Sequence, residues 1–439
     1  MKWAVYNLLF ALVYPFLLPG FLVRMLRRGG YAARMGDRFA LYPEGLLGAN
    51  GSFVWIHAVS VGEVQVAGQL MREWRKVEPG VRFCFSTTSS TGWKMAEKEL
   101  STLNSQLSTS SDVLIYNPLD FPNFVKSALR TVRPRAIVLT ESEIWPNFIL
   151  QARKMDIPLF LINARVSDRS APRYRAARWF FGEVLGSFAR IFAQSDLDKE
   201  RLVAAGAPAE KVKVTGSFKF DVARRNEAKE RELADWLFGA DGRDGRRVLL
   251  GGSTWPGEDV ALLNAYRKLL ASPGGDKTML VIAPRHFEKA DAVEANVRAA
   301  GFACVRRSRG ESAADAAAGS VYLADTTGEL MGLYGISDVV FVGKSLCEHG
   351  SQNMIEPCLC GKRVFVGPYT ENFRPVMSDL LAANALVQVR SEDELERGIL
   401  AAFAAPAEET AAAGERAAAA VRRRRGVVAK CIAEIRSVL

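Results

Sequence analysis

Short apolar runs alternate with longer amphipathic stretches from residue 50 onward, and this alternation restricts the fold more than any other feature of the chain. In the first half the predicted strands are Phe53–Val59, Val81–Ser86, Val113–Tyr116, Ala136–Thr140, Leu159–Ile162 and Ile191–Ala193. In the second half they are Val248–Leu250, Met279–Ile282, Val321–Leu323, Val339–Val342 and Arg363–Val366. Apolar strands that alternate with helices indicate βαβ units and a parallel sheet buried on both faces.

The alternation lapses between Phe218 and Arg246, where charged residues crowd together. A chain of 439 residues, of which 49% are hydrophobic and 24% charged, can bury more than one core. We therefore expect two Rossmann-like domains, at 29–220 and 246–439, joined by a linker at 221–245. The last helix could cross back to the first domain.

The N-terminal segment from Trp3 to Val23 is apolar apart from Asn7, and as a helix it is long enough to cross about 30 Å of hydrocarbon. It also contains the helix-breaking residues Pro15, Pro19 and Gly20, so a re-entrant or interface-lying segment is an alternative to a span. A buried core helix is a third reading, although such a helix would normally show a polar face. We expect residues 1–28 to be a membrane anchor. The arginines behind it, Arg24, Arg27 and Arg28, place the following domains on the cytoplasmic side.

The net charge of +10 could serve a nucleic acid, an anionic membrane or an anionic substrate. The basic residues are dispersed apart from the arginines behind the N-terminal segment and Arg422 to Arg425, and no nucleic-acid-binding motif is present. A membrane surface fits this pattern better than a nucleic acid. The six cysteines form one C-x-C and no C-x-x-C, so neither a disulfide framework nor a zinc site is expected.

Ligands of open parallel sheets bind beyond the carboxyl ends of the strands, so the junctions between strands and helices are the candidate sites. The first junction contains Ser60-Val61-Gly62-Glu63 at a helix start. A carboxylate there is stabilised as the anion, which suits a general base. An ordinary first-turn glutamate that caps backbone N–H groups is the equally open alternative. His57, before the strand end, is expected to pack or to orient a neighbour.

The fourth junction, Glu141-Ser142-Glu143-Ile144-Trp145-Pro146-Asn147, places two carboxylates beside a Trp-Pro turn. They could bind hydroxyls, position an acceptor or raise each other's pKa, whereas a capping carboxylate next to a solvated one is the structural alternative. Asn163-Ala164-Arg165 ends the next strand and is expected to face the same cleft.

The second half offers four further junctions. Gly251-Gly252-Ser253-Thr254-Trp255-Pro256-Gly257-Glu258 could hold phosphate on its backbone N–H groups, although a glycine-rich turn alone is weak evidence. Pro284-Arg285-His286 supplies an arginine that can clamp a phosphate. Asp325 to Leu330 opens another helix. The segment from Gly343 to Pro357 combines a glycine-rich loop with Asn353 and Glu356 on one helix face, where a carboxylate can accept both ribose hydroxyls.

Taken together and in order, these motifs closely resemble those of the Kdo transferases, which transfer 3-deoxy-D-manno-octulosonic acid (Kdo) from CMP-Kdo to a lipid A precursor. The most specific pieces are Ser60–Glu63, Glu141–Asn147, Asn163–Arg165, Val214-Thr215-Gly216-Ser217-Phe218-Lys219-Phe220-Asp221, Pro284–His286 and Asn353–Pro357. The resemblance spans most of the chain.

The resemblance implies a GT-B architecture, with two Rossmann-like domains facing a central cleft, the acceptor domain first and the nucleotide domain second. It implies that Glu63 is the general base and that Glu141 and Lys219 stabilise the transition state. The implied CMP-binding residues are Pro284, Arg285, Thr327, Gly328, Glu329, Leu330, Asn353, Met354, Ile355 and Glu356. The residues expected at the acceptor side or the cleft are Ser60, Gly62, Glu143, Asn163, Arg165, Ser253 and Thr254.

The implied reaction is an inverting transfer of Kdo from CMP-Kdo to a lipid A precursor, without a metal or another cofactor. The implied location is the inner membrane, with both domains on the cytoplasmic side, anionic lipids as partners and no nucleic acid. The chain departs from the family pattern at Lys344 and Ser351, where glycine is usual. The alternatives are a soluble nucleotide-sugar 2-epimerase of the same architecture, which would epimerise without an acceptor, and a non-enzymatic membrane scaffold, which would bind no nucleotide.

Overall fold

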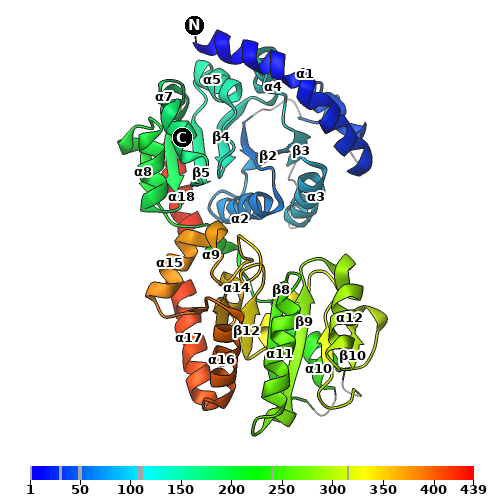
Figure 1. Cartoon of the computed structure of the whole chain (residues 1–439). Coiled ribbons are helices and arrows are strands. Elements are labelled where there is room, and N and C mark those ends of the chain that lie inside the picture. The colour runs from blue at the N-terminus through cyan, green and yellow to red at the C-terminus, as the bar shows by residue number, and fades with distance from the viewer. Residues whose placement is uncertain (1, 29–31, 48–51, 106–111, 240–241, 314–315) are drawn as a thin grey trace. The chain divides into compact units, whose positions relative to one another are not determined.

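The chain forms two α/β units, each built around a parallel sheet (Figure 1). The computed structural model describes all residues except 1, 29–31, 48–51, 106–111, 240–241 and 314–315, and it describes no side chain at 17–19, 21–28 or 32–33. Unit 1 comprises Met1–Val222 and Gly426–Leu439, and unit 2 comprises Ala223–Arg425.

The sheet of unit 1 has the strand order β3-β2-β1-β4-β5-β6-β7, and all neighbouring strands are parallel. Its strands are β1 (Phe53–His57), β2 (Arg82–Thr87), β3 (Val113–Tyr116), β4 (Pro134–Thr140), β5 (Leu159–Ala164), β6 (Arg190–Ala193) and β7 (Val212–Val214). Its helices are α1 (Lys2–Arg28), η1 (Ala32–Phe39), α2 (Val61–Val77), α3 (Ser90–Asn104), α4 (Pro122–Val132), α5 (Pro146–Lys154), α6 (Ala171–Ala176), α7 (Arg178–Gly186), α8 (Asp196–Ala204), η2 (Ala209–Lys211), α9 (Lys219–Val222) and α18 (Val427–Arg436). The strands after β1 go first to one side of it and then to the other, so the β1/β4 boundary is the switch point where ligands of such sheets bind.

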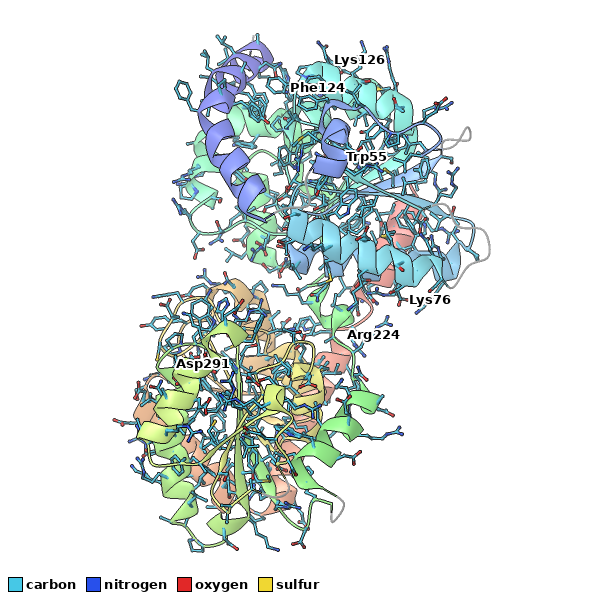
Figure 2. The ribbon with its side chains drawn as sticks, turned by 90° about the vertical axis from the view of Figure 1, so that its right-hand side faces the viewer. Trp55, Lys76, Phe124, Lys126, Arg224 and Asp291 are labelled. Atoms are coloured by element: carbon cyan, nitrogen blue, oxygen red, sulfur yellow. The ribbon has the colours of Figure 1, made fainter. Side chains whose placement is uncertain are left out.

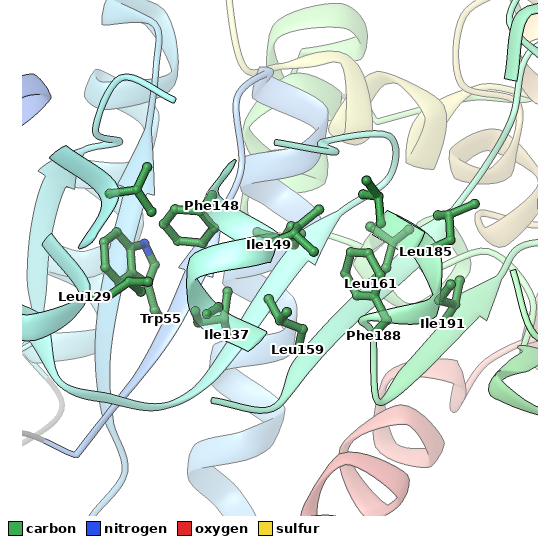
Figure 3. Close-up of a cluster of buried hydrophobic side chains, with 14 of the residues drawn as sticks. Trp55, Leu129, Ile137, Phe148, Ile149, Leu159, Leu161, Leu185, Phe188 and Ile191 are labelled. Carbon is green, nitrogen blue, oxygen red and sulfur yellow. The ribbon is translucent and has the colours of Figure 1, made fainter. Parts of the chain in front are cut away.

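Apolar side chains cover both faces of this sheet, as the uninterrupted apolar strands predict. Trp55 of β1 packs edge-on against Phe148 of α5 on one face, at 5.0 Å between ring centroids, within the cluster drawn in Figure 3. Val54 and Ile56 point to the other face, against α2 and α18. Trp55 lies inside the unit, whereas Lys76 projects from the end of α2 (Figure 2). The alternation along β1 thus anchors the strand between two helical layers.

Unit 2 repeats the design, with the strand order β10-β11-β9-β8-β12-β13-β14 and parallel pairing throughout. Its strands are β8 (Arg247–Thr254), β9 (Thr278–Pro284), β10 (Cys304–Arg306), β11 (Val321–Leu323), β12 (Val339–Val342), β13 (Arg363–Val366) and β14 (Val387–Gln388). Its helices are α10 (Glu227–Phe238), α11 (Glu258–Leu270), η3 (Gly275–Lys277), η4 (Phe287–Lys289), α12 (Ala290–Ala299), η5 (Arg307–Arg309), α13 (Leu330–Ile336), α14 (Ile355–Leu359), η6 (Glu371–Phe373), α15 (Arg374–Ala382), α16 (Glu392–Ala404) and α17 (Ala407–Arg423). Here the switch point lies between β8 and β12.

The stretch 221–245, expected as a linker, contains the end of α9 and the whole of α10. Helix α10 packs on α13 of unit 2 through Leu233, Leu237 and Phe238, which are buried. Of the charged residues that suggested a linker, Glu227, Arg231 and Glu232 are exposed, whereas Glu230 packs against Gly335 of α13. The chain then returns from unit 2 to unit 1, where the carboxylate of Asp221 accepts the backbone N–H groups of Gly426 and Val428 at 2.7 and 2.8 Å and so caps the start of α18.

Helix α1 lies against unit 1 beside α4, α5 and α7 (Figure 1). Tyr6 stacks on Phe180, Trp3 contacts the same ring at a tilt, and Phe10 and Tyr14 meet Phe121 edge-on. Within the described part of the chain, no helix has both the length and the apolar character needed to cross a bilayer.

The opposite face of α1 is apolar and exposed. It is formed by Val5, Leu8, Leu9, Leu12, Val13 and Phe16, which we call the outer stripe of α1, and Phe16 is 85% exposed. These positions recur at helical spacing, so they share one side of the helix. Helix α1 therefore has one apolar face packed on unit 1 and a second that is exposed. This explains why its sequence shows no polar face.

Candidate active site

Glu63 lies in the first turn of α2, directly beyond the end of β1. Its carboxylate accepts the backbone N–H of Val59 at 3.0 Å, the hydroxyl of Ser60 at 2.9 Å and the hydroxyl of Thr140 at 3.1 Å. In return the hydroxyl of Ser60 accepts the backbone N–H of Glu63 at 3.2 Å. Glu63 therefore caps the start of α2 together with Ser60. The hydroxyl of Thr140 links the Glu63 carboxylate to the end of β4. A Cβ at Gly62 would meet nothing within 4 Å, so packing does not require glycine beside this carboxylate.

The pKa of Glu63 is shifted in the direction opposite to the one expected for an anion stabilised at a helix start. Burial raises the pKa of Glu63, the nearby carboxylates Glu143 and Glu141 raise it further, and the hydrogen bonds from Val59 and Ser60 offset only part of this rise. Only 8% of the residue is exposed. A raised pKa brings a carboxylate closer to the range in which it is an effective general base.

Glu141 follows β4 and collects polar side chains from two other loops. It adopts a left-handed backbone conformation with φ +49°, which turns its carboxylate toward the end of β5. There it accepts the amide of Asn163 at 3.2 Å and pairs with the guanidinium of Arg165 at 3.0 Å. Burial lowers the pKa of Lys219, while the charge of Glu141 raises it and that of Arg165 lowers it. Lys219 thus belongs to the same electrostatic cluster.

Asn163, which the sequence placed only at a strand end facing the cleft, holds this arrangement together. Its side-chain oxygen accepts the backbone N–H of Phe218 at 3.0 Å, next to Lys219, while its amide donates to Glu141. Its backbone carbonyl accepts the side chain of Gln194 at 2.8 Å. The loops after β4, β6 and β7 therefore converge on one buried asparagine near the end of β5, which adopts φ +51°.

Glu143 and His57 meet at the same edge of the sheet. The indole N–H of Trp145 donates to Glu143 at 3.0 Å, and Nε2 of His57 lies 3.7 Å from the same carboxylate. Nδ1 of His57 contacts the carbonyl and the hydroxyl of Ser86 at 3.1 and 2.9 Å. His57 is fully buried, as expected of a residue that orients a neighbour.

The predicted residues of unit 1 thus lie at or just beyond the carboxyl ends of β1, β4, β5 and β7. They are Ser60, Gly62, Glu63, Glu141, Glu143, Asn163, Arg165 and Lys219. A buried carboxylate of raised pKa, with a second carboxylate that pairs with Arg165 and interacts with Lys219, can accept a proton and balance developing charge.

In unit 2, Pro284 ends β9 and is followed by the exposed Arg285. The carboxylate of Glu356 in α14 accepts the side-chain amide of Asn353 at 3.0 Å, whose own oxygen accepts the N–H of Ile355 at 3.1 Å. Burial raises the pKa of Glu356, and the Asn353 hydrogen bond and the charge of Arg285 lower it. Met354 and Ile355 are buried beneath this pair. The loops after β9 and β12 therefore bring Arg285 and Glu356 near each other.

The segment Thr327 to Leu330 follows β11, at the same edge of the sheet. Glu329 is engaged by Arg307 at 3.2 Å and by Lys229 at 3.8 Å, and Leu330 begins α13. The side chain of Glu329 therefore stabilises the protein, and Gly328, with φ +82°, shapes the turn before it. Among the described residues no group of three or more His, Cys, Asp or Glu is placed to hold a metal ion.

The glycine-rich motif Gly251–Glu258 was expected to follow the strand, but its first four residues are the end of β8, so the turn before α11 is confined to Trp255–Gly257. A Cβ at Gly251 would lie 2.4 Å from Leu262, and one at Gly252 would lie 2.8 Å from Tyr334. The two glycines thus let helices approach the strand. Ser253 and Thr254 are buried in unit 2, and Ser253 has φ +54°.

Known proteins are similar in sequence to most of the chain. Residues 33–222 match the family described as 3-deoxy-D-manno-octulosonic-acid transferase (kdotransferase). The chain is 34% identical over 392 residues to a 3-deoxy-D-manno-octulosonic acid transferase from Bordetella pertussis, covering 87% of this chain and 88% of that one. It is 30% identical over 349 residues to a bifunctional glycosyltransferase/methyltransferase from Fusobacterium nucleatum, covering 79% of this chain. It spans about half of that second relative, 52% of its length.

Solved structures of low sequence identity share the fold. A glycosyltransferase from Rickettsia africae is 12% identical with a TM-score of 0.58, covering 88% of this chain and 98% of that one. A putative UDP-N-acetylglucosamine 2-epimerase from Listeria monocytogenes is 14% identical with a TM-score of 0.59, covering 88% and 96%. The two parallel-sheet units thus resemble those of GT-B glycosyltransferases, a fold that the epimerase shares.

Proposed function

Since this chain belongs to the family of 3-deoxy-D-manno-octulosonic acid transferases and is a glycosyltransferase, we propose that it transfers Kdo from CMP-Kdo to a hydroxyl of a lipid A precursor. The single observation that carries the proposal is the buried network at the β1/β4 switch point, in which Glu63 lies beside Glu141 and Glu143. The epimerase reading shares the fold but not the family.

Glu63 is the general base of the proposed reaction. The acceptor oxygen forms a bond to the anomeric carbon of Kdo while the bond from that carbon to the CMP phosphate breaks. The hydroxyl proton passes to the Glu63 carboxylate, and CMP leaves with the bonding electron pair. Attack opposite the leaving group inverts the anomeric configuration.

Glu141 and Lys219 are the proposed stabilising groups for the transition state. As the bond to phosphate breaks, positive charge develops on the sugar ring and negative charge on the departing CMP. A carboxylate offsets the first charge and an ammonium the second. The pairing of Glu141 with Arg165 and Asn163 supports this role, because it holds the carboxylate in one orientation before the substrate arrives.

Unit 2 is the proposed CMP-binding unit. Arg285 would bind the phosphate with its guanidinium fork, and Glu356 would accept ribose hydroxyls with Asn353 fixing its orientation. Thr327 and Gly328 would offer backbone groups to the nucleotide. The burial of Glu356 beside an exposed arginine supports this assignment, because a buried carboxylate favours hydrogen-bond donors from a ligand.

We further propose that the outer stripe of α1 attaches the protein to the cytoplasmic face of the bacterial inner membrane, in contact with anionic lipids. An exposed apolar stripe on a helix whose other face is already packed favours an interface-lying helix. The net charge of +10 would add attraction to anionic lipids. Such attachment keeps the enzyme near an acceptor whose acyl chains remain in the bilayer.

Incubation of the purified chain with CMP-Kdo, in the presence and absence of a lipid A precursor, tests the proposed reaction. We expect CMP release that requires the acceptor, together with Kdo on the lipid. Epimerisation of a nucleotide sugar without an acceptor would instead favour the 2-epimerase reading. Absence of any nucleotide binding would favour a scaffold.

A further inference from the structure

The loop between β12 and α14 is closed by two backbone hydrogen bonds. The N–H of Ser351 donates to the carbonyl of Lys344 at 2.7 Å, and the N–H of Gln352 donates to that of Gly343 at 3.0 Å. Lys344 has φ +56° and Ser351 has φ +60°, so both adopt the left-handed conformation in which a side chain is strained. Gly343 cannot carry a side chain, because its Cβ would lie 2.3 Å from the carbonyl oxygen of Ser253.

Glu258 fixes the start of this loop. Its carboxylate, which is fully buried, accepts the backbone N–H groups of Lys344, Ser345 and Leu346 at 2.9, 3.0 and 3.0 Å. It also accepts the N–H of Trp255 at 2.8 Å and so ties the loop to the end of β8. The backbone of Lys344 is therefore held in place before any ligand binds.

The side chain of Lys344 is half-buried, and its ammonium lies over the indole of Trp255, with Nζ 4.6 Å from the ring centroid. This contact places a cation at the β8/β12 switch point of unit 2, where ligands of such sheets bind. The indole also lies edge-on to His286, 5.4 Å away, next to Arg285. Trp255 therefore stands between the loop of Lys344 and the loop of Arg285.

We propose that Lys344 is a donor-binding residue whose ammonium, positioned by Trp255, hydrogen-bonds an anionic oxygen of the sugar nucleotide. The donor carries two such groups, the phosphate of CMP and the carboxylate of Kdo, and Lys344 serves one of them. This role deepens the proposed function of unit 2 and rests on it. Glycine would adopt the backbone conformation of Lys344 without strain. A lysine at such a position is expected where its side chain has a function.

Lys344→Gly and Lys344→Met test the role of the ammonium, and Ser351→Gly is the matched control because it relaxes the paired left-handed position without removing a charge. We expect both lysine variants to bind the donor about tenfold more weakly or worse, as for loss of a charge-assisted hydrogen bond. Lys344→Gly should nevertheless unfold at the same or a higher temperature, since glycine relieves the backbone strain. Ser351→Gly should leave donor affinity unchanged.

Calorimetric titration with CMP, and KM for CMP-Kdo, identify the anion. Loss of affinity for both ligands assigns Lys344 to the phosphate, and loss confined to CMP-Kdo assigns it to the Kdo carboxylate. Unchanged values for both ligands in Lys344→Met would overturn the proposal, as would weakening in Lys344→Gly alone, which would indicate a backbone effect. If the unsubstituted protein binds neither ligand, the proposed function of unit 2 is wrong. Binding that depends on Arg285 but not on Lys344 would overturn only the proposed role of Lys344.

Discussion

The phenol of Tyr6 in α1 donates a hydrogen bond of 2.9 Å to the carboxylate of Asp120, which lies 1% exposed at the edge of the unit 1 sheet. The same carboxylate accepts the backbone N–H groups of Asn147 and Phe148 at 3.0 and 2.8 Å, at the start of α5. Asn147 also donates to Asn7 of α1 at 2.7 Å. The N-terminal helix is thereby joined to the segment that follows Glu143.

Asp120 should make the stability of the protein depend on pH. Burial raises the pKa of Asp120 to about 7, against the lowering effect of its three hydrogen bonds, whereas the unfolded carboxyl group has a pKa of about 3.9. Between these values the folded state binds the proton and the unfolded state does not, so stability falls as pH rises and levels off above pH 7. Denaturant midpoints measured from pH 5 to 8 should decrease, with a smaller slope for Asp120→Asn. Equal slopes in the two proteins would contradict the shifted pKa.

The outer stripe of α1 can be removed without unfolding the helix. A triple variant with serine at Leu8, Leu12 and Phe16 should lose sedimentation with vesicles that contain anionic lipids and keep its unfolding temperature. Activity on acceptor in detergent should also persist, since these side chains are exposed on the side of α1 that faces away from its packed aromatic residues. A control with serine at other exposed apolar positions, Leu41, Val260 and Leu381, should still bind vesicles. Vesicle binding by the stripe variant would refute the assignment of α1 as the membrane contact.

Deletion of residues 1–24 is a poorer test of membrane attachment, because it also removes the contacts of α1 with the rest of unit 1. Its loss would remove the Tyr6 hydrogen bond from buried Asp120 and the Lys2 and Trp3 contacts from Glu183. An unpaired buried carboxylate costs about 1–3 kcal/mol or more. We expect the truncated protein to unfold at a lower temperature than the stripe variant, as a thermal melt would show.

Arg285→Ala and Glu356→Gln should each weaken CMP binding by roughly tenfold or more, since each removes a charge-assisted contact to the nucleotide. Arg285→Lys should recover little of the loss, because an ammonium cannot reproduce a guanidinium fork. Arg267→Ala is the control and should titrate normally, because this exposed arginine donates to the carbonyl of Ala300 and lies over the ring of Phe302, away from the loops of Arg285 and Glu356. Normal CMP affinity in both site variants would place the nucleotide elsewhere.

Much of the fold followed from the sequence, because continuous apolar runs such as Val113–Tyr116 have few alternatives to a buried strand. The missed strands, β7, β10 and β14, are two or three residues long and carry no such run. The glycines of β8 were misread because their reason, the approach of Leu262 and Tyr334, comes from distant segments. The same holds for the site: Glu63 and Glu141 stand at strand ends that a pattern reveals, whereas the links through Asn163 and Asp120 depend on tertiary contacts.

The proposed catalytic role of Glu63 can be separated from its capping role because a second helix shares two of its capping hydrogen bonds. In α16, Glu394 accepts the N–H of Arg390 at 2.8 Å, and Ser391 accepts the N–H of Glu394 at 3.3 Å. In α2, Glu63 likewise accepts the N–H of Val59, and Ser60 accepts the N–H of Glu63. The shared capping bonds should therefore contribute a similar loss of stability in Glu63→Gln and Glu394→Gln, about 1 kcal/mol each.

The most direct measurement is mass spectrometry of the lipid formed from a purified lipid A precursor and CMP-Kdo by the unsubstituted protein, Glu63→Gln and Glu394→Gln. We predict that the unsubstituted protein and Glu394→Gln add Kdo to the lipid at similar rates. Glu63→Gln should be slower by roughly 10²-fold or more. Lipid without Kdo in every sample, or equal rates for the two variants, would contradict the account.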